Sequence, residues 1–268
     1  MSLSIIIPCK NEEKIILKTF QKIKKILKKK IKKFEIILID DFSDDNTINI
    51  LKKISIQNNN ITVIKNKIKG LGSAINLGIK FSKYKYVAIM MADLSDDPYD
   101  LIRYYNEISN NNLDAVFGSR FLKGSKVSDY PLKKLICNRI FNIFVKFIFL
   151  SKYNDFTNAF KIYKKKTLMD LKPLVSENFN IFLELPLKTL TRKKKFKIIS
   201  INWQNRKKGS SKFKINELSS KYFFTLIYCF FEKILLKWKK NWKPKIKYSG
   251  NINNLYLGRT KKTGIKAK

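Results

Sequence analysis

The sequence predicts an α/β fold in which helices cover both faces of a mostly parallel central sheet, followed by a C-terminal helical extension. Short apolar runs alternate with helical patterns through roughly the first 118 residues, as expected when crossover helices join parallel strands. Acidic residues follow directly after two of these runs, at the sheet edge where α/β proteins bind their ligands. The remaining residues predict longer apolar helices and isolated strands.

The first half of the chain contains five predicted strands, at residues 3–7, 34–39, 61–64, 86–90 and 114–117. The consecutive apolar residues at 86–90 are typical of a central strand that is buried on both faces. Asn11 and Glu12 are expected to open the first helix, because acids favour a helix N-terminus. Ser43 or Asp44 is expected to cap the second helix.

The second half of the chain interrupts this alternation. We expect helices at residues 131–150, 180–190 and 217–238, and strands at 158–163 and 196–203. The first and last of these helices mix aromatic, aliphatic and lysine residues, which fits either core helices on the sheet or interfacial helices on an anionic bilayer. The predicted organisation is a main domain over 1–215, an apolar helix over 216–243 and a basic tail over 244–268.

The composition restricts the possible functions. The chain carries 57 Lys and Arg residues against 20 Asp and Glu, a formal net charge of +37. This charge could indicate a nucleic acid, an anionic membrane surface or a phosphorylated substrate, whereas the joint enrichment of Lys, Ile and Asn also fits a coding bias toward A and T. Histidine is absent, so Ser-His-Asp triads, histidine bases and histidine metal sites are excluded.

Cysteine usage and hydropathy indicate the cellular compartment. The 3 cysteines are far apart and form no CxxC pair, so neither a zinc site nor a disulfide framework is expected. The N-terminal residues enter a predicted strand without a basic leader, and no run reaches the roughly 18 to 20 uncharged apolar residues of a membrane span. We therefore expect a cytoplasmic protein without a signal peptide or transmembrane helix.

The acidic residues are concentrated in two short segments, 40–45 and 93–100, which hold 8 of the 20 acids. Four of them lie near predicted helix starts and are better explained as helix caps than as functional residues: Asp44, Asp45, Asp96 and Asp97. Asp40, Asp41 and Asp93 lie at the strand ends themselves, where capping explains them poorly. Such oxygen ligands suit Mg²⁺ or Mn²⁺, which uses one or two carboxylates together with substrate phosphates.

Seven motifs, in order, resemble the family 2 glycosyltransferases, and most closely the dolichol-phosphate-mannose synthase-like branch. They lie at 7–12 (IPCKNE), 40–47 (DDFSDDNT), 70–72 (GLG), 92–98 (ADLSDDP), 118–120 (GSR), 155–160 (DFTNAF) and 206–212 (RKKGSSK). The resemblance covers about residues 1–215 and identifies them as a catalytic domain with a Rossmann-like glycosyltransferase A-type fold. It implies an inverting hexosyltransferase that moves a sugar from a nucleotide-diphosphate sugar to a polyprenyl or dolichyl phosphate, or to a cell-envelope glycan.

The resemblance also implies roles for single residues. The nucleotide sugar would lie against Pro8, Asn11, Glu12, Asp40, Asp41, Gly72 and Ala92. Asp93, with Ser95, would bind the Mg²⁺ or Mn²⁺ that bridges the donor diphosphate. Arg120, Arg206 and Lys212 would face a phosphate of the acceptor or the donor, and together with Asp93 they form the predicted catalytic set. A phosphate acceptor is already ionised at neutral pH, so no strong general base is required.

Two departures from the family pattern bear on these roles. Met91 stands where the family usually has the first acid of an Asp-x-Asp motif, so the cation would lose one carboxylate. We still expect metal dependence, although a non-catalytic relative that binds a nucleotide sugar is an alternative. Residues 158–161 read NAFK where the branch often has Ser-Gly-Phe-Arg, which affects the acceptor more than the reaction class.

The basic charge leaves two further alternatives. Residues 206–212 fit either a phosphate clamp or a solvated turn. A nucleic-acid-binding protein is disfavoured, because the acids at the predicted strand ends would repel a phosphate backbone. An enzyme of this branch without a membrane anchor would reach a polyprenyl substrate by peripheral attachment at the cytoplasmic face of a membrane.

Overall fold

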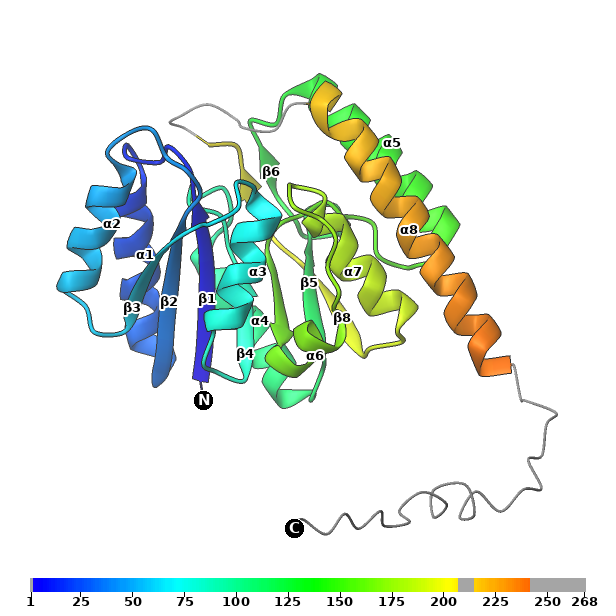
Figure 1. Ribbon diagram of the computed structural model, residues 1–268, viewed down its shortest axis with the longest axis horizontal. Helices are drawn as coiled ribbons and strands as arrows, with labels where there is room; N and C mark the ends of the chain where they lie inside the picture. The colour runs from blue at the N-terminus through cyan, green and yellow to red at the C-terminus, as the bar shows by residue number, and fades with distance from the viewer. Residues whose placement is uncertain (1, 207–214, 242–268) are drawn as a thin grey trace, which may run out of the picture.

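The structure, a computed structural model, describes residues 2–206 and 215–241, with side chains of the last helix placed over 219–238. Its centre is a seven-stranded sheet in the order β3-β2-β1-β4-β7-β5-β8 (Figure 1). The strands are β1 Ser2–Cys9, β2 Lys33–Asp40, β3 Ile61–Lys65, β4 Tyr86–Ile89, β5 Ala115–Ser119, β7 Lys161–Lys164 and β8 Phe196–Ser200. The predicted mostly parallel sheet is confirmed, with β7 as the antiparallel exception between β4 and β5.

Helices pack on both faces of this sheet, as expected. They are α1 Ile16–Lys30, α2 Thr47–Ile56, α3 Leu71–Phe81, α4 Pro98–Asn110, α5 Leu132–Phe149, α6 Lys165–Asp170, α7 Ile181–Thr191 and α8 Ile215–Asn241. Buried side chains of α1, α2 and α4 form one core with the sheet, and those of α3, α5, α6, α7 and α8 form the other. Alternate residues of β1 explain the split, because Ile5 enters the first core and Ile6 the second.

Several helix and strand boundaries differ from the sequence prediction. α1 begins at Ile16 and has no acid in its first turn, because Glu12 lies in the preceding turn and its carbonyl accepts from the Ile16 amide. α2 begins at Thr47, so capping by Ser43 or Asp44 was wrong. The Ser43 hydroxyl instead accepts a hydrogen bond from the Asn11 amide and ties the two loops together.

The fourth helix follows the prediction more closely. Asp97 is the N-cap of α4 and accepts a hydrogen bond from the Tyr99 amide at 3.1 Å, and Pro98 is the first helical residue. Asp96 therefore does not cap this helix. The predicted strand at 196–203 is divided into β8 and β9, Trp203–Gln204, and β9 pairs with β6, Val127–Ser128. The short elements β6 and α6 were not predicted.

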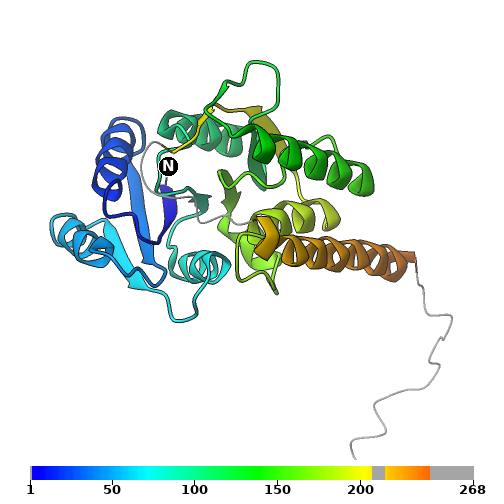
Figure 2. The same cartoon turned by 90° about the horizontal axis from the view of Figure 1, so that it is seen from above.

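Helices α5 and α8 lie at the end of the molecule beyond β8 (Figures 1 and 2). Their aromatic rings meet, with 5.7 Å between the ring centroids of Phe141 and Tyr222. None of the helices in the described part of the chain has the length and hydropathy that crossing a bilayer requires. The tail predicted over 244–268 lies outside the described residues.

Buried ion pairs hold α8 against α7. Lys188 is fully buried, with its ammonium 3.1 Å from a Glu184 oxygen and 3.7 Å from Glu232. The Arg192 Nε donates to Glu232 at 2.6 Å. The inner face of α8 is therefore fixed by charge as well as by apolar packing.

Candidate active site

The carboxyl edge of the sheet opens into one cavity of about 690 Å³. Its polar end is lined by Asp93, Ser95, Asp96, Arg120 and Arg206. Its other walls are rich in aromatic side chains from α5, α7, α8 and the neighbouring loops, with polar side chains such as Lys134, Asn138 and Thr157 among them. A ligand that fills this cavity would meet charge at one end and apolar surface at the other.

Asp93 is the centre of the polar end. Its Oδ1 accepts hydrogen bonds from the Ser95 amide at 3.0 Å and the Ser95 hydroxyl at 2.6 Å. Its Oδ2 accepts from Arg206 Nη2 at 2.8 Å, and Arg206 Nη1 donates to Glu12 at 3.4 Å. The structure therefore brings together four predicted residues from three distant segments, with Met91 on the lining of the same cavity.

The predicted nucleotide-binding residues lie at or just after the ends of β1, β2 and β4, except Gly72, which lies in the first turn of α3. The Asp41 Oδ1 accepts from the Gly70 amide at 2.8 Å and from Asn66 at 2.8 Å, so Asp41 holds the turn before α3. Asp40 is buried, and its Oδ1 has no hydrogen-bond partner among the described residues. An unsatisfied buried carboxylate oxygen is costly, which makes this atom a candidate acceptor for a ligand donor group.

The other predicted nucleotide-binding residues have structural contacts of their own. The Gly72 amide donates to the Glu177 carbonyl, and a Cβ at Gly72 would lie 2.0 Å from the Ser176 oxygen. Ala92 is buried, and its carbonyl accepts from Thr19. Pro8 pairs with Ile39, one residue before the end of the β1–β2 register and close to Asn11 in the sequence. None of these four predicted residues lines the cavity as the structure describes it.

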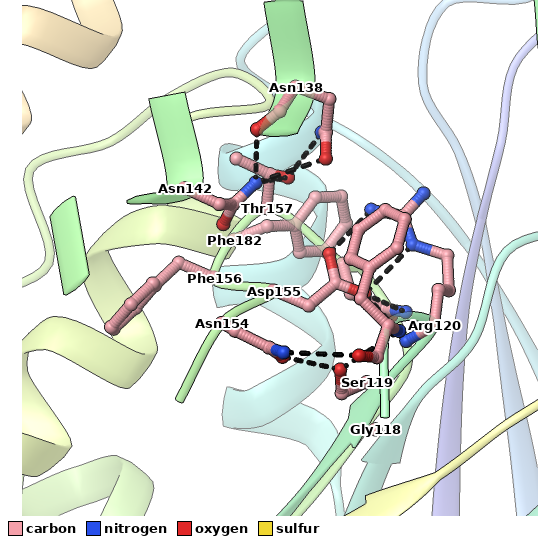
Figure 3. A network of polar contacts seen from close by, with 12 residues as sticks. Gly118, Ser119, Arg120, Asn138, Asn142, Asn154, Asp155, Phe156, Thr157 and Phe182 are labelled. Carbon is pink, nitrogen blue, oxygen red and sulfur yellow. Dashed lines mark hydrogen bonds and ion pairs between the residues drawn. The ribbon is translucent and has the colours of Figure 1, made fainter. Parts of the chain in front are cut away.

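Arg120 projects from the end of β5 into the cavity and is paired with Asp155 (Figure 3). Its Nε and Nη2 donate to the two carboxylate oxygens at 2.9 Å and 2.7 Å. The rings of Phe121, Tyr130 and Trp203 surround the guanidinium with centroids at 5.3 to 5.5 Å. Burial acts to lower the pKa of Arg120, but the Asp155 carboxylate outweighs it and holds that pKa above its ordinary value.

The loop that carries Asp155 is tied to its surroundings by amide side chains. Ser119 donates to Asn154 at 2.5 Å, and Asn138 of α5 donates to the Thr157 hydroxyl at 2.8 Å (Figure 3). Asn142 also donates to Thr157, at 3.1 Å. The position of α5 is therefore coupled to the loop that orients Arg120.

Two further ionisable residues of the site are buried: the sequence singled out Asp96 only as a helix cap or supporting residue, and it missed Lys161. Asp96 is 4% exposed on the cavity lining, where burial and the neighbouring Asp93 carboxylate raise its pKa to about 8. Lys161 begins β7, and its ammonium donates to the carbonyls of Phe156 and Asn158. Burial lowers the pKa of Lys161 to about 7. The available signals were an acid directly before a helix cap and a single lysine within an apolar strand pattern.

The polar end also offers oxygen ligands for a divalent cation. The described residues contain no group of three or more His, Cys, Asp or Glu side chains arranged to hold a metal. Asp93, Ser95 and Asp96 nevertheless all line the cavity and carry only oxygen donors. This set fits Mg²⁺ or Mn²⁺ when substrate phosphates complete the coordination. Lys212, predicted to join the phosphate-binding set, lies outside the described residues.

Comparison with known proteins identifies the family of the chain. The family model described as glycosyl transferase family 2 matches residues 4–172. The chain is 30% identical over 222 residues to a dolichol-phosphate mannosyltransferase of Pyrococcus furiosus, covering 80% of this chain and 60% of that one. It is 24% identical over 184 residues to a polyprenol monophosphomannose synthase of Mycolicibacterium smegmatis, covering 66% and 69%. An uncharacterised protein of Methanocaldococcus jannaschii is 32% identical over 179 residues, covering 62% and 73%.

Solved structures share the fold. A glucosyl-3-phosphoglycerate synthase from Mycobacterium tuberculosis, in complex with Mn²⁺, uridine diphosphate and phosphoglyceric acid, superimposes with a TM-score of 0.65 at 13% identity. The match covers 85% of this chain and 78% of that one. The predicted glycosyltransferase A-type fold is thereby confirmed. Because the family model spans more than half of the chain, this protein belongs to glycosyl transferase family 2 and is a glycosyltransferase.

Proposed function

We propose that this glycosyltransferase moves a sugar, with inversion, from a nucleotide-diphosphate sugar to a polyprenyl or dolichyl phosphate. The observation that carries the proposal is a cavity that joins Asp93, Arg120 and Arg206 to aromatic side chains from α5 and α8. A lipid phosphate has the matching form, with an anionic head and an apolar chain. The polyprenyl-phosphate relatives in the same family support this class of acceptor over a cell-envelope glycan.

The donor nucleotide would bind beside the cavity, at the ends of β1 and β2. Asp40 would accept a hydrogen bond from the nucleoside through the oxygen that has no partner among the described residues. Asn11, Glu12 and Asp41 would complete this wall, with Pro8, Gly72 and Ala92 shaping it through their backbone contacts. The donor diphosphate would then point toward Asp93.

A divalent cation, Mg²⁺ or Mn²⁺, would be held by Asp93 and Ser95. When bound, such a cation offsets negative charge on the leaving diphosphate. Met91 supplies no carboxylate ligand, so the donor phosphates would provide more of the coordination than in relatives with two acids. Asp96, on the same wall, would support the Asp93 side of the site.

Cationic side chains would position the phosphates. Arg206 contacts Asp93 and Glu12 and would exchange part of this contact for the donor diphosphate. Arg120 is held rigidly by Asp155 and presents a fixed positive charge to the acceptor phosphate. Lys212 would add a third cation. An ionised phosphate oxygen attacks without a strong base, which is consistent with a chain that has no histidine.

The proposed place of action is the cytoplasmic face of a membrane, with residues 1–215 as the catalytic domain and 216–243 as an interfacial helix. The experiment is a screen of radiolabelled nucleotide sugars against vesicles that contain polyprenyl phosphate, with and without Mn²⁺. Transfer to lipid that depends on Mn²⁺ is the expected result. Transfer to glycan and to no lipid phosphate would overturn the acceptor assignment.

A second candidate, a non-catalytic relative that binds a nucleotide sugar, is favoured by one observation, Met91 at the usual metal-ligand position. The two candidates differ in turnover. A catalytic chain releases nucleoside diphosphate from the donor, whereas a binding protein retains the donor intact. Calorimetric binding of the donor without either transfer or hydrolysis would establish the second candidate.

A further inference from the structure

Lys161 lies behind the wall of the cavity. It is 1% exposed, and its ammonium donates to the Phe156 carbonyl at 3.1 Å, to the Phe182 carbonyl at 3.5 Å and to the Asn158 carbonyl. An ammonium has three N–H donors, so the number of donors matches the number of carbonyl acceptors. Asn158 and Phe182 themselves line the cavity. Lys161 therefore joins two parts of the wall, the loop before β7 and the first turn of α7.

The second buried lysine, Lys188, has a different environment. Its ammonium lies within ion-pair distance of two carboxylates, those of Glu184 and Glu232. In the described part of the chain Lys161 forms no such pair. Burial lowers the pKa of Lys161, and the Asp155 carboxylate, which acts to raise it, is itself paired with Arg120. Burying a charge without a paired counter-charge is costly, so the stability of the fold explains Lys161 poorly.

The carbonyls that Lys161 contacts belong to the loop that orients Arg120. Asp155, at the start of this loop, accepts from the Arg120 guanidinium through both carboxylate oxygens and from the Arg120 amide at 2.9 Å (Figure 3). The Asn158 amide donates to the Asp155 carbonyl at 3.1 Å and closes a turn. Asp155 thus holds Arg120 at one end of the turn, and Lys161 holds the other end. A shift of the turn would shift the guanidinium with it.

We propose that Lys161 is a positioning residue, which fixes the Arg120 guanidinium in the cavity by holding the backbone of residues 156–158. Lys161 does not line the cavity, so it acts on a bound phosphate only through Arg120. That the phosphate belongs to a lipid acceptor rests on the proposed function. The positioning of Arg120 does not.

The first test needs no substrate, because Trp203 reports on Arg120. The centroid of the Trp203 ring lies 5.5 Å from the guanidinium carbon. The other two tryptophans of the chain, Trp238 and Trp242, are replaced by phenylalanine so that the fluorescence comes from Trp203. Arg120→Gln then defines the emission change that follows loss of the guanidinium. At pH 6, below the pKa of Lys161, we expect Lys161→Met to shift the emission in the same direction.

The matched control is Lys188→Met, the same change at a buried lysine whose ion pairs lie in α7 and α8. Lys161→Arg, with the residue that the family branch often has at this position, should restore the wild-type emission. Circular dichroism checks that each variant folds, and Lys161→Gln replaces Lys161→Met if the latter unfolds. Unchanged Trp203 emission in the folded variant, or an equal shift in Lys188→Met, would overturn the proposal.

The second test uses sugar transfer to polyprenyl phosphate. Misplacing a positioning group can cost up to about 10²-fold in rate, and we expect Lys161→Met to raise the KM for polyprenyl phosphate about tenfold. The KM for the nucleotide sugar should not change. In an Asp155→Asn background Lys161→Met should cost nothing further, because both residues act through Arg120, and additive losses would overturn the proposal. If the wild type transfers no sugar to polyprenyl phosphate, the acceptor assignment fails, whereas Trp203 emission still decides the role of Lys161.

Discussion

Strands β3, β2, β1 and β4 form a wholly parallel half of the sheet, whereas β7, β5 and β8 form a half in which β7 runs the other way. In the parallel half, charged side chains of the site follow the strands directly, and Asp40 keeps an oxygen without a partner among the described residues. In the mixed half, charges pair with each other in the interior, as Arg120 does with Asp155 and Lys188 with Glu184. The first arrangement keeps a carboxylate oxygen available to a ligand, although Asp93 and Glu12 pair with Arg206; in the second, the ion pairs also fix loops and helices.

This difference predicts that substitutions in the parallel half mainly change turnover, and that those in the mixed half change stability as well. The largest effect should come from Asp93→Asn. Loss of one preorganised electrostatic contact to the reacting groups costs about 10²–10³-fold in rate. We expect that loss in a sugar-transfer assay, with a smaller decrease in stability than for Asp155→Asn, because the Asp93–Arg206 pair is the more exposed of the two. Asp97→Asn makes the same chemical change four residues away and serves as the control. An equal loss of transfer rate in that variant would contradict a special role for Asp93.

Asp155→Asn tests the mixed half. The substitution leaves the buried Arg120 guanidinium without its counter-charge, and breaking a buried pair in this way costs about 3–5 kcal/mol of unfolding free energy. Urea unfolding should show this decrease together with lost transfer. The control is Glu107→Gln, whose pair with Lys197 is largely exposed and should cost at most about 1 kcal/mol. Equal unfolding free energies of Asp155→Asn and Glu107→Gln would contradict a stabilising role for the buried ion pairs of the mixed half.

Lys161 provides a pH-dependent test of the same half. Its pKa is about 7 in the folded chain and about 10.4 in an unfolded one, so between these values the unfolded state binds the extra proton. The contribution of Lys161 to the free energy of unfolding therefore rises as the pH increases from 7 to 10, by roughly 3 kcal/mol or more. Lys161→Met should lack this rise. Parallel unfolding curves for both proteins across this pH range would exclude a buried, neutral lysine.

The smallest effect is expected at the cap of α4. Asp97→Ala removes the hydrogen bond to the Tyr99 amide and should lower the unfolding free energy by about 1 kcal/mol. Transfer should stay within about threefold of the wild type, because Asp97 does not line the cavity. A rate loss as large as that of Asp93→Asn would mean that the carboxylate cluster acts as one unit.

The sequence predicted the position of a site residue where that residue directly follows a strand or belongs to a recognisable motif. Parallel strands place Glu12 and Asp93 at the same edge of the sheet. The family motifs predicted that Arg206 belongs to the same site, and Arg206 forms ion pairs with both residues. The partner of Arg120 was not predictable in the same way, because Asp155 lies 35 residues away and neither spacing nor hydropathy connects the two. The pattern likewise predicted a strand near Lys161 but not its reversed direction or the burial of its ammonium.

The reversed direction of β7 has a consequence for how this enzyme type diversifies. β5 ends at Ser119 and β7 begins at Lys161 beside it, so the chain between them leaves and re-enters the sheet at the same edge. This excursion contains α5, the Asp155 loop and much of the apolar cavity wall. Its length and sequence can be exchanged without shifting the register of any strand. Under the proposed function the excursion forms the acceptor side of the site and the parallel half forms the donor side, so we expect exchange of the excursion to alter acceptor preference without altering donor binding.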